Sequence, residues 1–125
     1  MALPARGATP YVVRHGFGYT VFEHTENGIV SEVWVYVAMD APVKFTVVKL
    51  RNVSGRPRRI SVTGYWEWVL GDLRAKSLLH VQTEVDVETG ALLARNPFNT
   101  EFPERVAFID VNEQSRTLTG DRCEF

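Results

Sequence analysis

The sequence is poor in cysteine, and Cys123 is its single example. One thiol excludes an internal disulfide and a cysteine-based zinc site. It also suits a reducing compartment, so we expect a cytoplasmic protein. Long apolar runs are missing as well: no stretch approaches the roughly 20 residues of a spanning helix. Residues 1–10 lack the apolar segment of a signal peptide. We therefore expect that this chain makes no contact with a membrane.

Neither positive nor negative charge is in marked excess. The chain carries 14 Lys and Arg against 15 Asp and Glu, for a formal net charge of -1. This balance gives no long-range attraction to nucleic acid, so we expect no nucleic-acid partner. The densest basic run is Arg56-Pro57-Arg58-Arg59, at a predicted turn and strand start. A solvated strand edge is the favoured interpretation, with a contact to phosphate or a polyanion as the alternative.

Helical periodicity is almost absent, and only Leu73–Leu79 could form a helical turn. The apolar segments alternate with period 2 instead, which is typical of strands with one face in a core. The longest such segment is Arg59–Leu70. The pattern predicts strands over residues 19–26, 29–38, 43–52, 59–70, 80–87, 91–95 and 105–111.

Turn signals separate these strands. Asn27-Gly28 is a strong hairpin signal, because both residues accept a positive φ. Ser54-Gly55-Arg56-Pro57 and Glu88-Thr89-Gly90 are further turns. Strands at regular spacing joined in this way predict an all-β fold, an antiparallel β-sandwich over residues 11–125 after a disordered or extended lead-in, residues 1–10.

Two features indicate that this sandwich belongs to a larger assembly. The strand Ile29–Ala38 is apolar on both parities, so we expect it to be covered on both faces. The C-terminal sequence "LTGDRCEF" begins an element that has no room to finish. We therefore expect an incomplete domain, truncated at its C-terminus. We also expect a homo-oligomer, with an edge strand or the C-terminal segment in the contact.

The sequence gives little support for a metal site, a nucleotide site or a self-contained catalytic site. His15, His24 and His80 match no metal-ligand spacing, and we expect His15 and His24 on opposite faces of a strand. Gly16-Phe17-Gly18 lacks a third glycine and precedes a strand rather than a helix, so no cofactor is predicted. Glu67 in "YWEW" could act as a catalytic acid, but the alternation places it opposite the tryptophans as an outward residue. No catalytic residue is assigned.

Sugar binding is harder to dismiss, because aromatic rings stack on pyranose rings. Trp66 and Trp68 are weaker candidates, for which packing in a core between sheets is the favoured interpretation. Phe17 and Tyr19 lie in the glycine-rich segment that leads into the predicted strand over residues 19–26. For these two residues, sugar stacking and packing in a core both remain open.

The segments "YVVRHGFGYTVFEHTENGI", "SEVWVYVAMDAPVKFTVVKLRNVSGRPRRISVTGYWEWVLG", "TEVDVETGALLARNPFNTEF" and "GDRCEF" carry a resemblance. From Tyr11 to Phe125 the chain resembles the N-terminal β-sandwich region of inverting glycoside phosphorylases, the group of cellobiose and chitobiose phosphorylases. The resemblance is strongest to the phosphorylase-like part of cyclic β-1,2-glucan synthases.

This resemblance implies a β-supersandwich, similar to galactose mutarotase, that precedes a helical catalytic barrel. In the family the catalytic acid and the phosphate site belong to the barrel, and no segment here matches it. The implied function is therefore a non-catalytic module that packs on the barrel and contacts β-glucan or another oligosaccharide. The implied parent protein is anchored at the inner membrane. A free-standing carbohydrate-binding or protein-interaction module is the alternative.

The segment Arg14–Tyr19 is the main site candidate. Its glycines allow a tight bend, so that Arg14 and His15 point away from the sheet in a shaped loop. We expect Arg14, His15, Phe17 and Tyr19 to bind sugar or to dock on the barrel. The alternative is a loop that only closes the end of the sandwich.

Overall fold

The computed structural model describes residues 7–113 and 115–121. The "DRCEF" end, whose role in an oligomer contact was anticipated above, lies largely outside the described residues. The described residues form two compact units, one within residues 7–62 and one within residues 63–121. Among the described residues, no helix is long and apolar enough to cross a membrane. The fold is nearly all-β, as predicted, with one antiparallel sheet in each unit.

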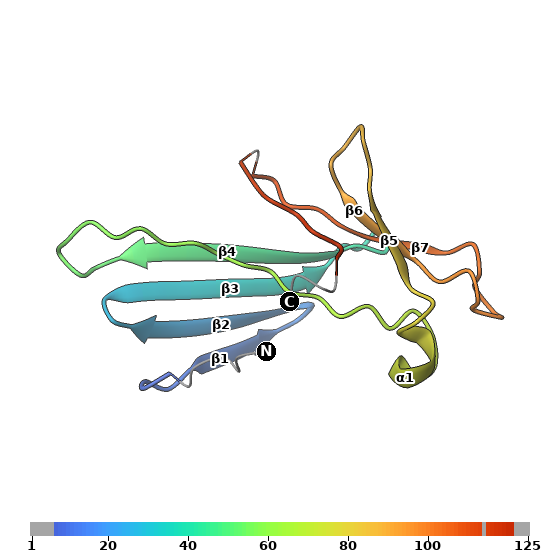
Figure 1. Cartoon of the computed structure of the whole chain (residues 1–125). Helices are drawn as coiled ribbons and strands as arrows, with labels where there is room; N and C mark the ends of the chain where they lie inside the picture. The colour runs from blue at the N-terminus through green and yellow to red at the C-terminus, as the bar shows by residue number, and fades with distance from the viewer. Residues whose placement is uncertain (1–6, 114, 122–125) are drawn as a thin grey trace. The chain divides into compact units, whose positions relative to one another are not determined.

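The first unit is a four-stranded antiparallel meander. Its strands β1 (Val12–Gly16), β2 (Tyr19–Glu26), β3 (Ile29–Val37) and β4 (Lys44–Asn52) lie side by side in sequence order (Figure 1). The three longer strands confirm the period-2 prediction. Strand β1 was not predicted, since its segment was expected to form a loop.

The turn between β2 and β3 confirms the Asn-Gly signal. Asn27 has a φ of 50° and Gly28 a φ of 76°, the two positive values that a tight hairpin turn of this kind requires. Gly28 also lies against the chain that leaves β4: a Cβ atom added there would be 2.5 Å from Ser54 Cβ and 2.8 Å from Ser54 Cα. The position therefore needs glycine for two separate reasons.

The register divides the first sheet into two different faces, because direct cross-strand partners point the same way. We name the aromatic face by its rings and charges, Arg14, Tyr19, Glu23, Glu32, Trp34, Tyr36, Phe45 and Lys49. We name the valine face by its opposite set, Val13, His15, Thr20, Phe22, His24, Val33, Val35, Val48 and Leu50. Val21, which is 2% exposed, is buried on the aromatic face, whereas β4 is exposed along its whole length.

The second unit combines a helical turn with a three-stranded sheet. The helix α1 (Arg74–Ser77) falls where the sequence allowed one. Strands β5 (Gln82–Val85), β6 (Leu92–Arg95) and β7 (Val106–Ile109) pair antiparallel in that order. The buried side chains of this unit are Ser77, Ala91, Leu92, Ala94 and Asn96.

The predicted strand over Arg59–Leu70 is wrong for this structure, which assigns no strand to the segment. Alternation shows which residues share a face, but a strand also needs a neighbour that accepts its ladder hydrogen bonds. The segment keeps local contacts between residues two apart, such as Tyr65 with Glu67, as extended backbone does. It ends at Leu70, whose φ of 44° is unusual for a side chain of this kind.

Candidate functional site

The segment Arg14–Tyr19 is a tight hairpin and not the shaped loop that the glycines suggested. Residues up to Gly16 belong to β1, and Gly16 pairs directly with Tyr19 across a turn of Phe17 and Gly18. Arg14 and His15 are therefore neighbours in a strand. They point to opposite faces of the sheet instead of pointing away from it together.

Arg14 lies on the aromatic face, where its guanidinium forms an ion pair with the Glu23 carboxylate on β2. On the same face, the Trp34 indole N–H donates to the Glu32 carboxylate, and so does Lys49 Nζ at 3.1 Å. The Trp34 hydrogen bond and then the Lys49 hydrogen bond lower the pKa of Glu32. Arg51 lies on this face as well, and the exposed ion pairs of the face add little to stability.

His15 lies on the valine face, with its Nδ1 hydrogen-bonded to Thr20 Oγ1 at 3.0 Å. His24 lies on this same face, so the expectation of opposite faces was wrong. A two-residue turn separates the two histidines, and counting in steps of two does not carry across a turn. His24 is engaged separately: its ring stacks on Tyr11 at 4.0 Å, and its Nε2 lies 2.8 Å from Thr9 Oγ1.

Tyr19 belongs to a group of rings that pack on one another. Its ring stacks on Trp34 at 5.3 Å, and a Cβ added to Gly16 would meet the Tyr19 Cζ. Tyr36 and Phe45 stack at 5.2 Å. These rings pack on one another, yet Tyr19, Tyr36 and Phe45 remain 42%, 37% and 43% exposed, so part of each ring stays accessible for stacking.

Phe17 differs from this group. It is the tip of the β1–β2 hairpin, and its exposure of 106% leaves the whole ring open. Met39, in the β3–β4 connection, is 104% exposed. Because Tyr19 pairs with Tyr36 and Tyr36 pairs with Phe45, the two connections leave the same end of the sheet. We call this the apolar end, defined by Phe17, Val37 and Met39.

The tryptophans of the second unit occupy intermediate positions. Trp66 is 46% exposed with its ring against Gly64, and Trp68 is half-buried. Glu67 accepts hydrogen bonds from the Tyr65 hydroxyl at 3.0 Å and Arg74 Nη2 at 2.7 Å. The first of these raises the pKa of Tyr65. Glu67 is thus engaged by Tyr65 and by an ion pair with Arg74.

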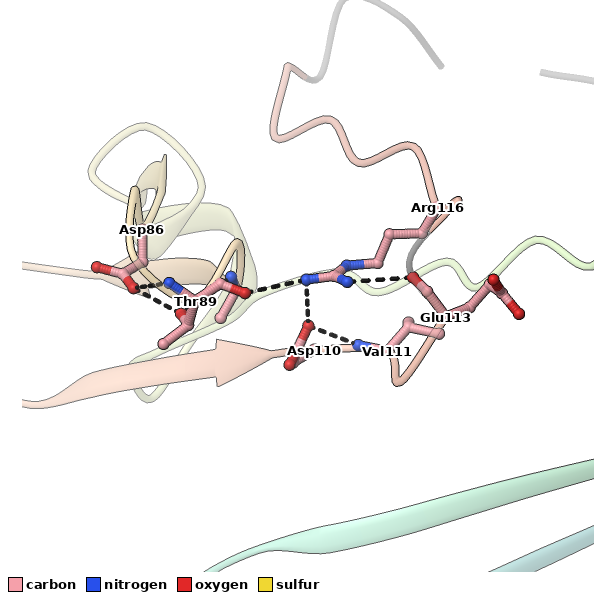
Figure 2. Close-up of polar contacts among 7 residues, drawn as sticks. Asp86, Thr89, Asp110, Val111, Glu113 and Arg116 are labelled. Carbon is pink, nitrogen blue, oxygen red and sulfur yellow. Dashed lines mark hydrogen bonds and ion pairs between the residues drawn. The ribbon is translucent and has the colours of Figure 1, made fainter.

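A polar cluster around Arg116 was missed by the sequence analysis (Figure 2). Arg116 Nη2 lies 2.9 Å from Asp110 Oδ1 and donates to the Thr89 carbonyl at 3.1 Å, and Nη1 donates to the Glu113 carbonyl. Asp86 accepts from the Thr89 amide at 2.8 Å and from its hydroxyl, and these two bonds lower the pKa of Asp86. The cluster fastens the chain after β7 onto the β5–β6 turn.

A second buried network holds the strained Leu70. Asn96, which is 6% exposed, donates from Nδ2 to the Leu70 carbonyl at 3.0 Å, and Asn99 donates to the same oxygen at 3.1 Å. The Asn96 Oδ1 accepts from the Phe98 amide. Both networks hold backbone carbonyls of distant segments, and in the Arg116 cluster the buried Nε atom of Arg116 has no hydrogen-bond partner among the described residues.

Within residues 7–113 and 115–121, no group of three His, Cys, Asp or Glu side chains could hold a metal ion. A shallow cavity of about 420 Å³ lies beside β5 and β6, lined by Thr83, Glu84, Val85, Leu92 and Leu118–Asp121. None of the sequence-predicted site residues lines it. Phe17, at the hairpin tip, is the most exposed of the sequence-predicted aromatic residues.

These features define a sheet-based module with an exposed apolar tip at the β1–β2 hairpin. The chain belongs to the supersandwich domain family of glycosyl hydrolase 94, whose family model matches residues 1–125. It is 34% identical over 124 residues to the cyclic beta-(1,2)-glucan synthase NdvB of Rhizobium meliloti (strain 1021). It is 33% identical over 70 residues to the N,N'-diacetylchitobiose phosphorylase of Vibrio furnissii.

The alignments cover very unequal shares of the proteins. They take in 99% of this chain but 4% of the glucan synthase, and 56% of this chain but 9% of the phosphorylase. No solved structure gives a significant match. The resemblance seen in the sequence is therefore confirmed at the level of the family.

Proposed function

We propose that the chain is a non-catalytic supersandwich module of a carbohydrate-active enzyme related to glycoside phosphorylases and cyclic β-1,2-glucan synthases. In this role it packs on a helical catalytic barrel and contributes a contact to β-glucan. The family match over the whole chain carries the proposal. The single cysteine suits a cytoplasmic position for the module.

The apolar end supports the docking part of this proposal. Phe17 and Met39 are almost fully accessible and leave the same end of one sheet. The Phe17 turn is pinned by direct pairing of Gly16 with Tyr19 and by the His15–Thr20 hydrogen bond. A rigid aromatic tip loses little conformational entropy on docking, so it is well suited to fill a pocket in a partner.

A chimaera tests the docking role. The aligned segment of the cyclic β-1,2-glucan synthase would be replaced by this chain, and glucan synthesis would be measured. We expect the chimaera to be active and Phe17→Ala to reduce the rate at least about tenfold, because one buried aromatic anchor contributes more than about 1.4 kcal/mol. Val53→Ala is the control, since Val53 is 52% exposed but lies at the other end of the sheet. Equal rates for the two variants would contradict the docking role.

The isolated chain separates the module from its alternatives. Incubated with β-1,2-linked glucan oligomers or N,N'-diacetylchitobiose, with and without inorganic phosphate, it should release no sugar or sugar phosphate. Release of product would overturn the non-catalytic assignment. Calorimetric titration with the same oligomers tests the free-standing binding module, which predicts saturable heat without any barrel.

A further inference from the structure

Four arginines gather at the end of the first sheet opposite the apolar end. We call this the arginine end, and it consists of Arg51, Arg56, Arg58 and Arg59. The chain leaving β4 crosses the β2–β3 turn here: the Val53 amide donates to the Gly28 carbonyl at 2.8 Å. Arg58 Nη1 also donates to the Asn27 carbonyl at 3.1 Å.

The turn that carries these arginines is rigid. Asn52 Nδ2 donates to the Arg56 carbonyl at 2.7 Å, while Asn52 Oδ1 accepts from the Ser54 amide at 3.0 Å and from the Ser54 hydroxyl at 2.6 Å. One side chain therefore closes the turn from both sides. The guanidinium groups are presented from a fixed backbone rather than from a mobile loop.

The arginine end lacks counter-charges. Within the described residues, no carboxylate lies within 4 Å of any of its four guanidinium groups, all of which belong to exposed residues. Four of the arginines elsewhere, Arg14, Arg74, Arg95 and Arg116, each form an ion pair, whereas Arg105 lies over the Phe102 ring. Like charges gathered without partners repel one another, and an acidic surface would relieve that repulsion.

The second unit offers such a surface. Residues 7–62 carry seven Lys and Arg against four Asp and Glu, a net charge of +3, whereas residues 63–121 carry five against ten, a net charge of -5. Glu101 and Glu104, in the β6–β7 connection, are exposed and form no ion pair with a described residue. One chain thus carries a basic surface and an acidic surface that are complementary in charge.

We propose that the arginine end binds the acidic second unit of another copy of this chain, with Glu101 and Glu104 as its counter-charges. The contact is head to tail: the arginine end of one copy binds the acidic unit of the next copy. The acidic unit of the first copy stays free to bind the arginine end of a third. It differs from pairing of strand edges, since it depends on charge and not on backbone hydrogen bonds. Salt therefore weakens it, as the Debye length falls from about 30 Å at 0.01 M to about 3 Å at 1 M.

Sedimentation equilibrium of the whole chain at micromolar concentration tests the contact. We expect an average mass of at least twice the 14.2 kDa of the chain in 20 mM salt, falling to 14.2 kDa in 0.5 M salt. Two variants should each remain at 14.2 kDa in low salt: Arg56→Glu with Arg59→Glu, and Glu101→Lys with Glu104→Lys. None of these four side chains takes part in the hydrogen-bond networks described above.

Mixing the two variants gives the decisive measurement. Each variant keeps one native surface that fits the other, and the two charge-reversed surfaces are also complementary, so an equimolar mixture should associate again to at least twice the chain mass. A mixture that stays monomeric would overturn the proposal. So would a wild-type chain that is monomeric in low salt, or one whose association persists in 0.5 M salt, as strand-edge pairing would. Low-salt binding to anionic vesicles or heparin without self-association would assign the arginine end to another partner and refute this one.

Discussion

Substituting Gly28 by alanine isolates the crossing of the β2–β3 turn and the chain after β4. The new Cβ would lie 2.5 Å from Ser54 Cβ and 2.8 Å from Ser54 Cα, and the residue would keep a φ of 76°. Gly55→Ala is the matched control: its φ is 72°, but nothing lies within 4 Å of the added Cβ. The two variants share the conformational cost and differ in the close contact.

The expected loss in the free energy of unfolding follows from the conformational cost and the close contact. A left-handed conformation costs a residue with a Cβ about 1–2 kcal/mol, which applies to both variants. Inserting an atom into a closed contact adds about 1–3 kcal/mol, which applies to Gly28→Ala alone. We expect a loss in the free energy of unfolding of about 1–2 kcal/mol for Gly55→Ala and about 2–5 kcal/mol for Gly28→Ala.

Urea unfolding followed by tryptophan fluorescence measures both, because Trp34 lies in the same sheet. At a slope of about 1–3 kcal/mol per molar urea, the two midpoints should differ by roughly 1 M. Adding Ser54→Gly to Gly28→Ala should recover part of the loss, since it removes the nearest atom. Equal midpoints for Gly28→Ala and Gly55→Ala would refute the crossing.

Three further changes probe the networks. Glu32→Gln should flatten the fall in stability of the first sheet below about pH 4: a carboxyl with a lowered pKa stabilises the fold above its unfolded pKa and loses that contribution as it is protonated. Unfolding midpoints across pH 2.5–6 that match wild type would contradict this. Asn96→Ala should cost about 2–3 kcal/mol in urea unfolding, because it removes one of two donors to the Leu70 carbonyl within a buried network; a loss under about 0.5 kcal/mol would show that Asn99 suffices. Arg116→Met should speed amide hydrogen exchange in the β5–β6 turn and leave β1–β4 unchanged, and unaltered exchange in the turn would show that the ion pair with Asp110 fastens nothing.

Local signals predicted the fold well where the structure itself is local. Asn27-Gly28 gave the correct hairpin because both φ values are set by two adjacent residues. The runs that became β2, β3 and β4 were visible because each strand pairs with the next along the chain. The short β1 was hidden by Gly16 and Gly18, which suggested a loop although one of them lies in the strand.

The failures concern relations between distant residues. Alternation in Arg59–Leu70 could not reveal that no neighbour pairs with it in this structure. The Arg116 cluster joins residues 27 positions apart, and no spacing in the sequence announces it. For the site, the sequence singled out Phe17 but could not show that Tyr19 lies against Gly16 and stacks on Trp34, since ring contacts are set by register across three strands.

The two ends of the first sheet are held apart by the strands themselves. Strand β2 has eight residues, which at about 3.4 Å per residue separates the Phe17 turn from the Asn27-Gly28 turn by about 24 Å. That distance exceeds the Debye length of about 8 Å at physiological salt, so a charge bound at the arginine end is screened from the apolar end. The sheet acts as a spacer between two independent contacts. Losses from substitutions at both ends should add, and a partner seated at one end leaves the other free to be occupied at the same time.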